Sequence, residues 1–288
     1  MTMTTPTYGR PTRPTRPRRL IAAARRDPLL TIGLGIVAVS IFLALFGTVI
    51  APKSPTEPTG APSEHPSLSH WMGTDASGLD VFSQVISAPR TDVVLAVSAA
   101  LVSSVLGTLI GLTAGYFRTW WAEVVMRISD VIQAFPVFIL GMMLVALSGR
   151  NTGNLIVALS LLYTPIFIRL TRAEVLTQRN RSYVESARAM GNSEWRIAFR
   201  HVLPNSLAPS LIQLSVTVGF GILLTAGLSY VGAGVRPPTP EWGLMISSSA
   251  NQLILGEWWP SVFPGLAISF TVFGFAAVGN AIERRVGG

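Results

Sequence analysis

The side chains that most often carry chemistry are scarce in this sequence. It has no cysteine, which excludes disulfides, thiolate nucleophiles and cysteine-ligated metals. The three histidines, His65, His70 and His201, fall in segments separated by three long apolar stretches, so we predict no histidine metal site. The only lysine, Lys53, follows a proline, whereas a phosphate-binding P-loop requires Gly-Lys before Ser or Thr. We therefore expect no catalytic residue, metal site or bound cofactor in this chain.

The densest polar patterning lies in segment 185–204, which separates two apolar stretches. A first helix is predicted to break at Gly191, because glycine tolerates the left-handed conformation that commonly ends helices. Ser193 can then cap a second short helix that runs to His201. Pro204 is expected to end this second helix before the next apolar stretch begins.

On the second predicted helix, aromatic and basic side chains recur at helical spacing. Trp195, Phe199 and Val202 share one face, and Arg196 and Arg200 form a basic ridge beside it. An aromatic knob flanked by arginines suits insertion into a groove on a partner protein. The alternative is an ordinary solvated loop that binds no partner.

This segment resembles the EAA loop of bacterial ABC importer permeases, in which E-A-A, a glycine and a terminal Leu-Pro are separated by fixed intervals. Glu185, Ala187, Gly191, Leu203 and Pro204 match that spacing, whereas Ser186 replaces the middle alanine and His201 replaces an aliphatic residue. The resemblance implies that the second short helix is a coupling helix that seats in an ATPase subunit. The residues expected to serve this coupling are Glu185, Ala187, Gly191, Ser193, Trp195, Arg196, Phe199, Arg200, Leu203 and Pro204.

The composition indicates an integral membrane protein. Only 12% of the residues are charged, and the mean hydropathy is +0.49. Arginines crowd residues 1–28, ahead of an uncharged stretch, and the same region is rich in proline and threonine. We expect this tail to be disordered, cytoplasmic and able to lie against anionic lipid. Charge retained on the cytoplasmic side explains the net charge of +8 without a nucleic-acid partner.

Six apolar stretches predict an all-α, polytopic membrane protein with six transmembrane helices. They cover residues 29–51, 93–116, 131–147, 155–168, 207–231 and 262–282. The fourth is short unless it extends through Arg169. The remaining parts are an extracytoplasmic segment at 52–92, a five-helix core at 93–283 with a cytoplasmic loop at 173–205, and a cytoplasmic C-terminus at 284–288.

The distribution of basic residues orients these helices with both termini in the cytoplasm. In that orientation 18 of the 22 basic residues lie inside. The outer segments then carry only Lys53, Arg90, Arg150 and Arg236. No ionisable residue is expected at mid-membrane depth, which disfavours a secondary transporter driven by protons or sodium.

The fifth apolar stretch carries polar and small residues at steps of three or four. They are Ser210, Gln213, Thr217, Gly221 and Thr225. This stripe could line a translocation path, or it could form hydrogen bonds between packed helices. The glycines of the second stretch, Gly107, Gly111 and Gly115, recur every four residues and predict close helix packing.

Two expected outer segments carry further motifs. In residues 52–92, Asp75 and Asp80 stand among glycines, where they can cap turns and a short helix; the spacing does not fit a calcium-binding loop. The run around Pro237, Pro238 and Trp242 holds a third proline and a Trp-Gly pair. Trp242, Trp258 and Trp259 are predicted to lie at the lipid headgroups.

Both runs resemble the C-type permease subunit of oligopeptide and dipeptide importers, a family that also includes nickel and glutathione importers. In this family the outer side forms the outer gate and meets a substrate-binding protein, a role the resemblance gives to Asp75, Asp80, Pro237, Pro238 and Trp242.

The resemblance implies a type I ABC importer permease fold and a non-catalytic permease subunit in the bacterial plasma membrane. The implied partners are a homologous B-type permease, two ATPase subunits or one fused ATPase that bind ATP and Mg²⁺, a substrate-binding protein and membrane lipid. Di- or oligopeptides are the expected substrates, with nickel, glutathione or porphyrin as alternatives. A nucleotide-independent channel or secondary transporter, or a membrane scaffold, is the alternative outside this class.

Overall fold

The computed structural model of the chain describes residues 28–117 and 119–286, so the predicted tail at 1–28 lies almost wholly outside the described residues. The described residues form helices and connecting loops, with no strand among them beyond one isolated bridge between Thr74 and Asp80. The predicted all-α membrane architecture is therefore confirmed.

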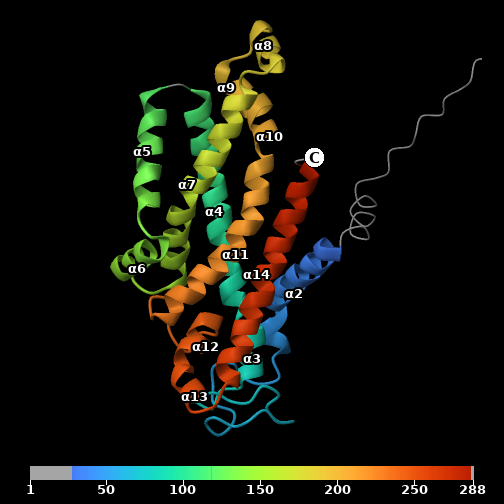
Figure 1. Cartoon of the computed structure of the whole chain (residues 1–288), viewed down its shortest axis with the longest axis vertical. Coiled ribbons are helices and arrows are strands. Elements are labelled where there is room, and N and C mark those ends of the chain that lie inside the picture. Colours follow the sequence, from blue (N-terminus) through green and yellow to red (C-terminus); the bar gives the residue numbers. More distant parts are fainter. Residues whose placement is uncertain (1–27, 118, 287–288) are drawn as a thin grey trace, which may run out of the picture.

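Five helical stretches are long and apolar enough to cross a membrane (Figure 1). They are α2 (Pro28–Ile50), α3 (Val81–Ser87) together with α4 (Pro89–Tyr116), α7 (Thr152–Gln178), α11 (Ala208–Tyr230) and α14 (Trp259–Val286). Helix α4 lies at the centre and packs against α2, α7 and α11. The apolar stretches thus locate these helices correctly, although most of the helices extend beyond the apolar residues.

The predicted third helix at 131–147 is wrong as a single rod. Helix α5 (Trp120–Ala134) ends there, α6 (Val137–Ser148) begins after two residues, and the two are bent by 97°. Pro136 causes the break, because proline lacks an N–H donor and forces the preceding residue out of the helical region. Phe135 accordingly has the extended angles φ −83° and ψ 142°. Counted as one broken span, α5 and α6 bring the number of spans to six.

The glycines of α4 allow it to approach α7 closely, as predicted. A Cβ atom built on Gly111 would lie 2.7 Å from the carbonyl oxygen of Ile168 and 2.9 Å from the Cβ of Thr171. Such contacts are too short for a Cβ atom, so the close approach of the two helices at this position requires glycine.

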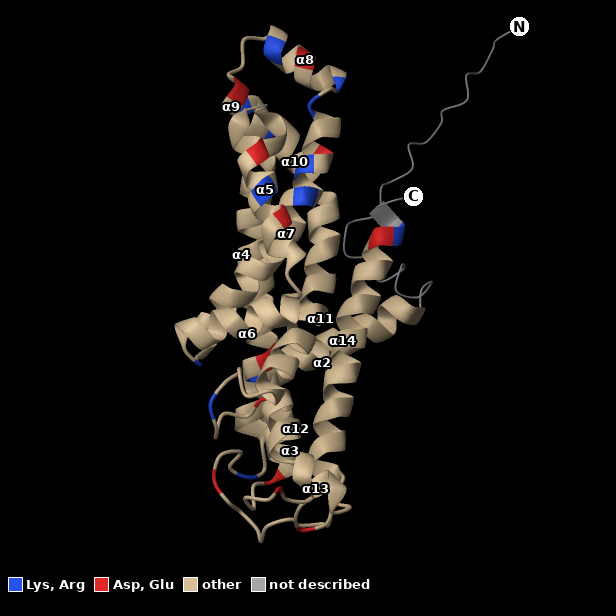
Figure 2. Cartoon of the chain, turned by 60° about the vertical axis from the view of Figure 1, so that its left-hand side comes forward, with Lys and Arg blue, Asp and Glu red and all other residues tan. Residues whose placement is uncertain are grey.

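The fourth helix extends well past its apolar core, and one of its charged residues pairs with a neighbouring helix. Helix α7 continues to Gln178, and Arg169 pairs with Asp130 of α5 at 2.6 Å. Among the described residues, charged side chains gather toward the two ends of the helical bundle, while its middle is largely free of them (Figure 2). This separation is typical of a protein whose central band contacts lipid.

The two ends of the bundle are built differently. At one end lie the short helices α8 (Ser182–Ala189) and α9 (Glu194–Ile197). At the other end, residues 51–80 and the loop 231–258, with α12 (Trp242–Ser248) and α13 (Ala250–Ile254), form a compact layer that we call the cap (Figure 1).

Candidate functional site

Segment 185–204 forms the elbow that the sequence predicts. Helix α8 ends at Ala189, and Gly191 adopts φ +80°, a conformation that favours glycine. The Ser193 hydroxyl accepts a hydrogen bond from the backbone N–H of Arg196 at 3.4 Å and caps α9. The elbow therefore follows from one glycine and one capping serine.

The expectation that Pro204 ends the second helix is wrong. After α9 the chain makes a π-helical turn, η1 (Ala198–Val202), and continues into α10 (Leu203–Ser206), which contains Pro204 in its first turn. Proline is tolerated at this position because the first N–H groups of a helix have no intrahelical acceptor. Pro204 has no backbone N–H, and the wide π turn before it accommodates the hydrogen bond that Pro204 cannot make. The chain therefore remains helical almost to the start of α11.

The outward face of the segment carries two stacked aromatic rings. Trp195 is 57% exposed and Phe199 is 41% exposed, with ring centroids 5.8 Å apart. Arg196 and Arg200 are also exposed. Val202 is fully buried and does not share this face, because the π turn changes the helical register after residue 197.

The remaining family positions divide between packing and exposure. Ala187 is buried and Leu203 packs against the same apolar cluster, so both hold the segment to the bundle. Glu185 and Pro204 are exposed. Glu185 stands in the first turn of α8, where its charge favours the helix dipole.

The polar stripe of α11 does not lie on one open surface. Ser210 is buried and its hydroxyl lies 3.0 Å from that of Thr171 on α7. Thr225 is also buried, and its hydroxyl donates to the carbonyl of Gly221. Gly221 itself packs against Ala96 of α4. Ser210 therefore forms a hydrogen bond between packed helices, the alternative that the sequence left open, while Gly221 packs against α4 and Thr225 bonds within α11.

The other two stripe residues, Gln213 and Thr217, border a cavity of about 660 Å³ between α5, α6, α7 and α11. The Gln213 side chain donates to the Thr217 hydroxyl at 3.2 Å. Most of the lining is apolar, and the further polar side chains are Gln133 and Tyr163. The break at Phe135 opens onto the same cavity, as expected where a helix is interrupted at membrane depth. The lining contains no ionisable carboxylate or basic side chain.

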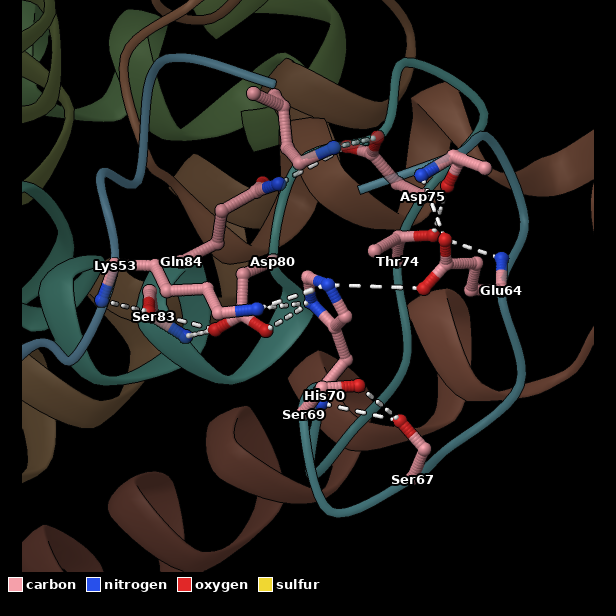
Figure 3. A network of polar contacts seen from close by, with 12 residues as sticks. Lys53, Glu64, Ser67, Ser69, His70, Thr74, Asp75, Asp80, Ser83 and Gln84 are labelled. Atoms are coloured by element: carbon pink, nitrogen blue, oxygen red, sulfur yellow. Dashed lines mark hydrogen bonds and ion pairs between the residues drawn. The ribbon is translucent and has the colours of Figure 1, made fainter. Parts of the chain in front are cut away.

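In the cap, Asp75 and Asp80 organise the chain as predicted, by capping (Figure 3). Asp80 caps α3 by accepting from the backbone N–H of Ser83 at 2.9 Å, and its other oxygen lies 2.9 Å from Nδ1 of the buried His70. Lys53 Nζ lies 2.9 Å from His70 Nε2, so the histidine bridges a cation and a carboxylate. Asp75 accepts from the backbone N–H groups of Ser77 and Leu79.

The prediction that Trp242 and Trp259 lie at the lipid headgroups is wrong. Trp242 is buried in the cap, and Trp259, the first residue of α14, is buried against it. The Trp242 indole donates to the Val85 carbonyl at 3.1 Å, and the Trp259 indole to the Thr74 carbonyl at 3.0 Å. A carbonyl of helix α3 and a carbonyl of the loop at Thr74 satisfy the two indole N–H groups, so no interfacial water is needed. Trp258 is exposed, in keeping with the predicted anchor.

Pro237 and Pro238 are exposed on the loop that leads to α12. Beyond them lies a carboxylate pair that the sequence did not reveal. Glu241 is fully buried and caps α12 through the N–H groups of Gly243 and Leu244, at 3.0 and 2.6 Å. Asp92 of α4 is buried beside it and accepts from the backbone N–H of Trp242 at 3.1 Å. This contact joins α4 directly to the cap. The sequence could not predict this contact, because its two residues are 150 positions apart in the chain.

Among the described residues, no group of three or more His, Asp or Glu side chains could hold a metal ion. The polar features therefore consist of an exposed aromatic face at one end, an uncharged cavity in the bundle and a buried hydrogen-bond network at the other end.

Comparison with known proteins shows the family to which the chain belongs. Residues 107–288 match the family model of the binding-protein-dependent transport system inner membrane component. A glutathione transport system permease protein from Pectobacterium atrosepticum is 37% identical over 221 residues, which are 77% of this chain and 73% of the relative. A dipeptide transport system permease protein from Alkalihalophilus pseudofirmus is 35% identical over 269 residues, or 92% and 88% of the two chains. The chain therefore belongs to the family of multi-pass inner membrane permeases of binding-protein-dependent ABC importers.

Proposed function

We propose that this chain is the permease subunit of an ATP-driven importer that carries di- or oligopeptides delivered by a substrate-binding protein. The observation that carries the proposal is the outward Trp195–Phe199 face on a glycine elbow, within a chain of this permease family. The relatives are named for dipeptide and glutathione transport, and both of these substrates are peptides.

Segment 185–204 docks into an ATPase subunit in this proposal. Trp195 and Phe199 enter a groove on the partner, Arg196 and Arg200 contact its rim, and Glu185 pairs with a basic residue. The ATPase subunits, two separate chains or one fused chain, bind ATP and Mg²⁺, so this chain itself needs no cofactor. The segment and both termini then lie in the cytoplasm, in line with the distribution of basic residues.

The cavity beside α11 forms this subunit's part of the translocation path, and a homologous B-type permease completes it. Gln213, Thr217, Gln133 and Tyr163 offer neutral donors and acceptors that suit the amide groups of a peptide. Because no charged side chain lines the cavity, we expect it to discriminate little between acidic and basic peptides.

The substrate-binding protein docks on the cap in this proposal, where Pro237 and Pro238 stand exposed. Asp75, Asp80 and Trp242 support that surface from within by capping and burial. Closure of the ATPases moves the docked segments, opens the cavity toward the cap and admits the substrate.

Reconstitution tests the proposal. The chain is purified with the ATPase and permease subunits that accompany it, placed in vesicles, and supplied with a binding protein and either labelled dipeptides or glutathione. ATP-dependent uptake is expected, and Gln213→Leu is expected to reduce uptake while leaving the complex assembled. Solute movement without ATP, or Gln213→Leu uptake equal to that of the unaltered chain, would contradict the respective parts of the proposal.

A further inference from the structure

The carboxylate of Glu194, the first residue of α9, is held from two other helices. Arg188 of α8 donates through Nε to Oε1 at 2.7 Å and through Nη2 to Oε2 at 3.1 Å. The hydroxyl of Tyr116, the last residue of α4, donates to the Oε2 atom. One side chain therefore links α8, α9 and the end of α4. We call Arg188, Glu194 and Tyr116 the clamp.

Neighbouring contacts fix the same junction. The ring of Phe117, directly after α4, lies 4.6 Å from that of Trp195. Arg179, which follows α7, donates to the carbonyls of Gly115 and Tyr116 at 3.2 and 2.9 Å. Beneath the clamp, α4, α7, α8 and α9 share a buried apolar cluster. The end of α4 is thus attached to the elbow by charge, ring contact and packing.

The carboxylate at the centre of the clamp, that of Glu194, stays ionised. The hydrogen bonds from Arg188 and Tyr116 lower the pKa of Glu194 to about 2, so its carboxylate is charged at any physiological pH. Hydrogen bonds to a charged acceptor are stronger and more directional than those between neutral groups. A side chain held in this way transmits a displacement better than an apolar contact, which can slide.

At its other end, α4 is attached to the cap. Asp92 accepts from the backbone N–H of Trp242, so the two ends of this one helix contact the elbow and α12 respectively. Among the described helices, α4 therefore forms a direct link between the two functional ends.

We propose that Glu194 is a positioning residue that joins segment 185–204 to α4, so that force applied to the aromatic face enters this helix. The inference rests on the proposed docking of an ATPase. A partner that grips Trp195 and Phe199 displaces α9, the clamp stops α9 from sliding on α4, and the movement reaches the cap through α4. Without the clamp, ATP hydrolysis continues but less of it drives opening.

The test uses the complete transporter in vesicles and measures peptide uptake per ATP hydrolysed. Tyr116→Phe removes the hydroxyl that links α4 to Glu194 and leaves the Arg188 pair intact. Tyr183→Phe is the matched control, because its hydroxyl donates to Gln178 at 3.1 Å outside the clamp. Tyr116→Phe is expected to lower the uptake-to-hydrolysis ratio several-fold with the ATPase still bound, and Tyr183→Phe to leave it unchanged. A ratio equal to that of the unaltered chain in Tyr116→Phe overturns the inference.

A charge exchange separates positioning from simple stabilisation. Arg188→Glu and Glu194→Arg each break the pair, whereas the double variant restores it with the charges reversed, and its new arginine can donate to the Tyr116 oxygen. We expect both single variants to lower the ratio and the double variant to recover it. If the variants lower thermal stability but keep the ratio, the clamp is only structural. If the unaltered chain does not bind an ATPase at all, the proposed function fails instead, which distinguishes the two outcomes.

Discussion

At the α8–α9 end, Trp195 and Glu185 face outward, whereas Trp259 and Asp80 at the opposite end are buried. Trp195 is largely exposed and Glu185 meets solvent, but Trp259 is 1% exposed and Asp80 is buried beside His70. A buried indole or carboxylate whose partners all lie in the chain stabilises the fold, whereas an exposed one is available to bind another molecule. Residue type alone therefore does not separate a docking surface from a structural network.

The largest expected contrast is between two tryptophans. Trp259→Ala should reduce the free energy of unfolding by about 3–5 kcal/mol, because it removes a fully buried ring and its hydrogen bond to Thr74. Trp195→Ala should change stability little and abolish copurification of the ATPase. Thermal unfolding in detergent and affinity purification measure the two effects. Equal destabilisation by both variants would erase the contrast between the ends.

A pair of acidic residues gives the next contrast. Asp80→Ala should cost roughly 2–4 kcal/mol, because it removes the cap of α3 and leaves the buried His70 ring without its acceptor. Glu185→Gln should alter stability by less than about 0.5 kcal/mol, as for other exposed substitutions. Unfolding midpoints of the two purified variants check this. A stability loss confined to Glu185→Gln would reverse the assignment.

Two glycines with positive φ lie at opposite ends of the molecule. Gly191 has φ +80° and Gly256 in the cap has φ +90°, and a Cβ atom on either would meet no described atom within 4 Å. Valine at either position should cost a similar 1–2 kcal/mol in backbone strain. Only Gly191→Val should uncouple ATP hydrolysis from uptake, because only that glycine shapes the docked elbow. Full ATP-driven uptake by Gly191→Val would disprove the coupling role.

The smallest expected effect is a pH dependence at the clamp. The pKa of Glu194 is about 2, below the ordinary value of about 4.3. A group whose pKa is lowered on folding contributes stability above its unfolded pKa and loses it as the pH falls through the folded value. The difference in thermal stability between the unaltered chain and Glu194→Gln should be constant from pH 5 to 8 and shrink below about pH 4. A change between pH 6 and 8 would point to another group.

Much of the architecture could be predicted from local sequence. The apolar stretches located the long helices, the glycines of α4 indicated its close contact with α7, and Gly191 with Ser193 predicted the elbow. In each case the signal and the structure that it determines lie within one or two helical turns. The bend at Pro136 has an equally local cause, but an apolar run conceals it, because hydropathy does not register a missing backbone donor.

The contacts on which the proposed coupling rests are long-range. Tyr116 and Glu194 are 78 residues apart, and Asp92 and Trp242 are 150 apart, so no periodicity reveals either pair. The same holds for burial. The stripe on α11 is evident in the sequence, but only the tertiary structure shows that Ser210 meets α7 and Gly221 meets α4, and that Gln213 and Thr217 border the cavity.

Membrane character, the helices and the conformation of the elbow follow from local sequence, because hydrophobicity, glycine and capping groups act over short distances. The exposure of each tryptophan, the polar residues that reach the cavity and the attachment of the elbow to α4 depend on the three-dimensional packing of the chain. These properties depend on which surfaces of distant helices meet, and that is settled by the packing of the whole bundle.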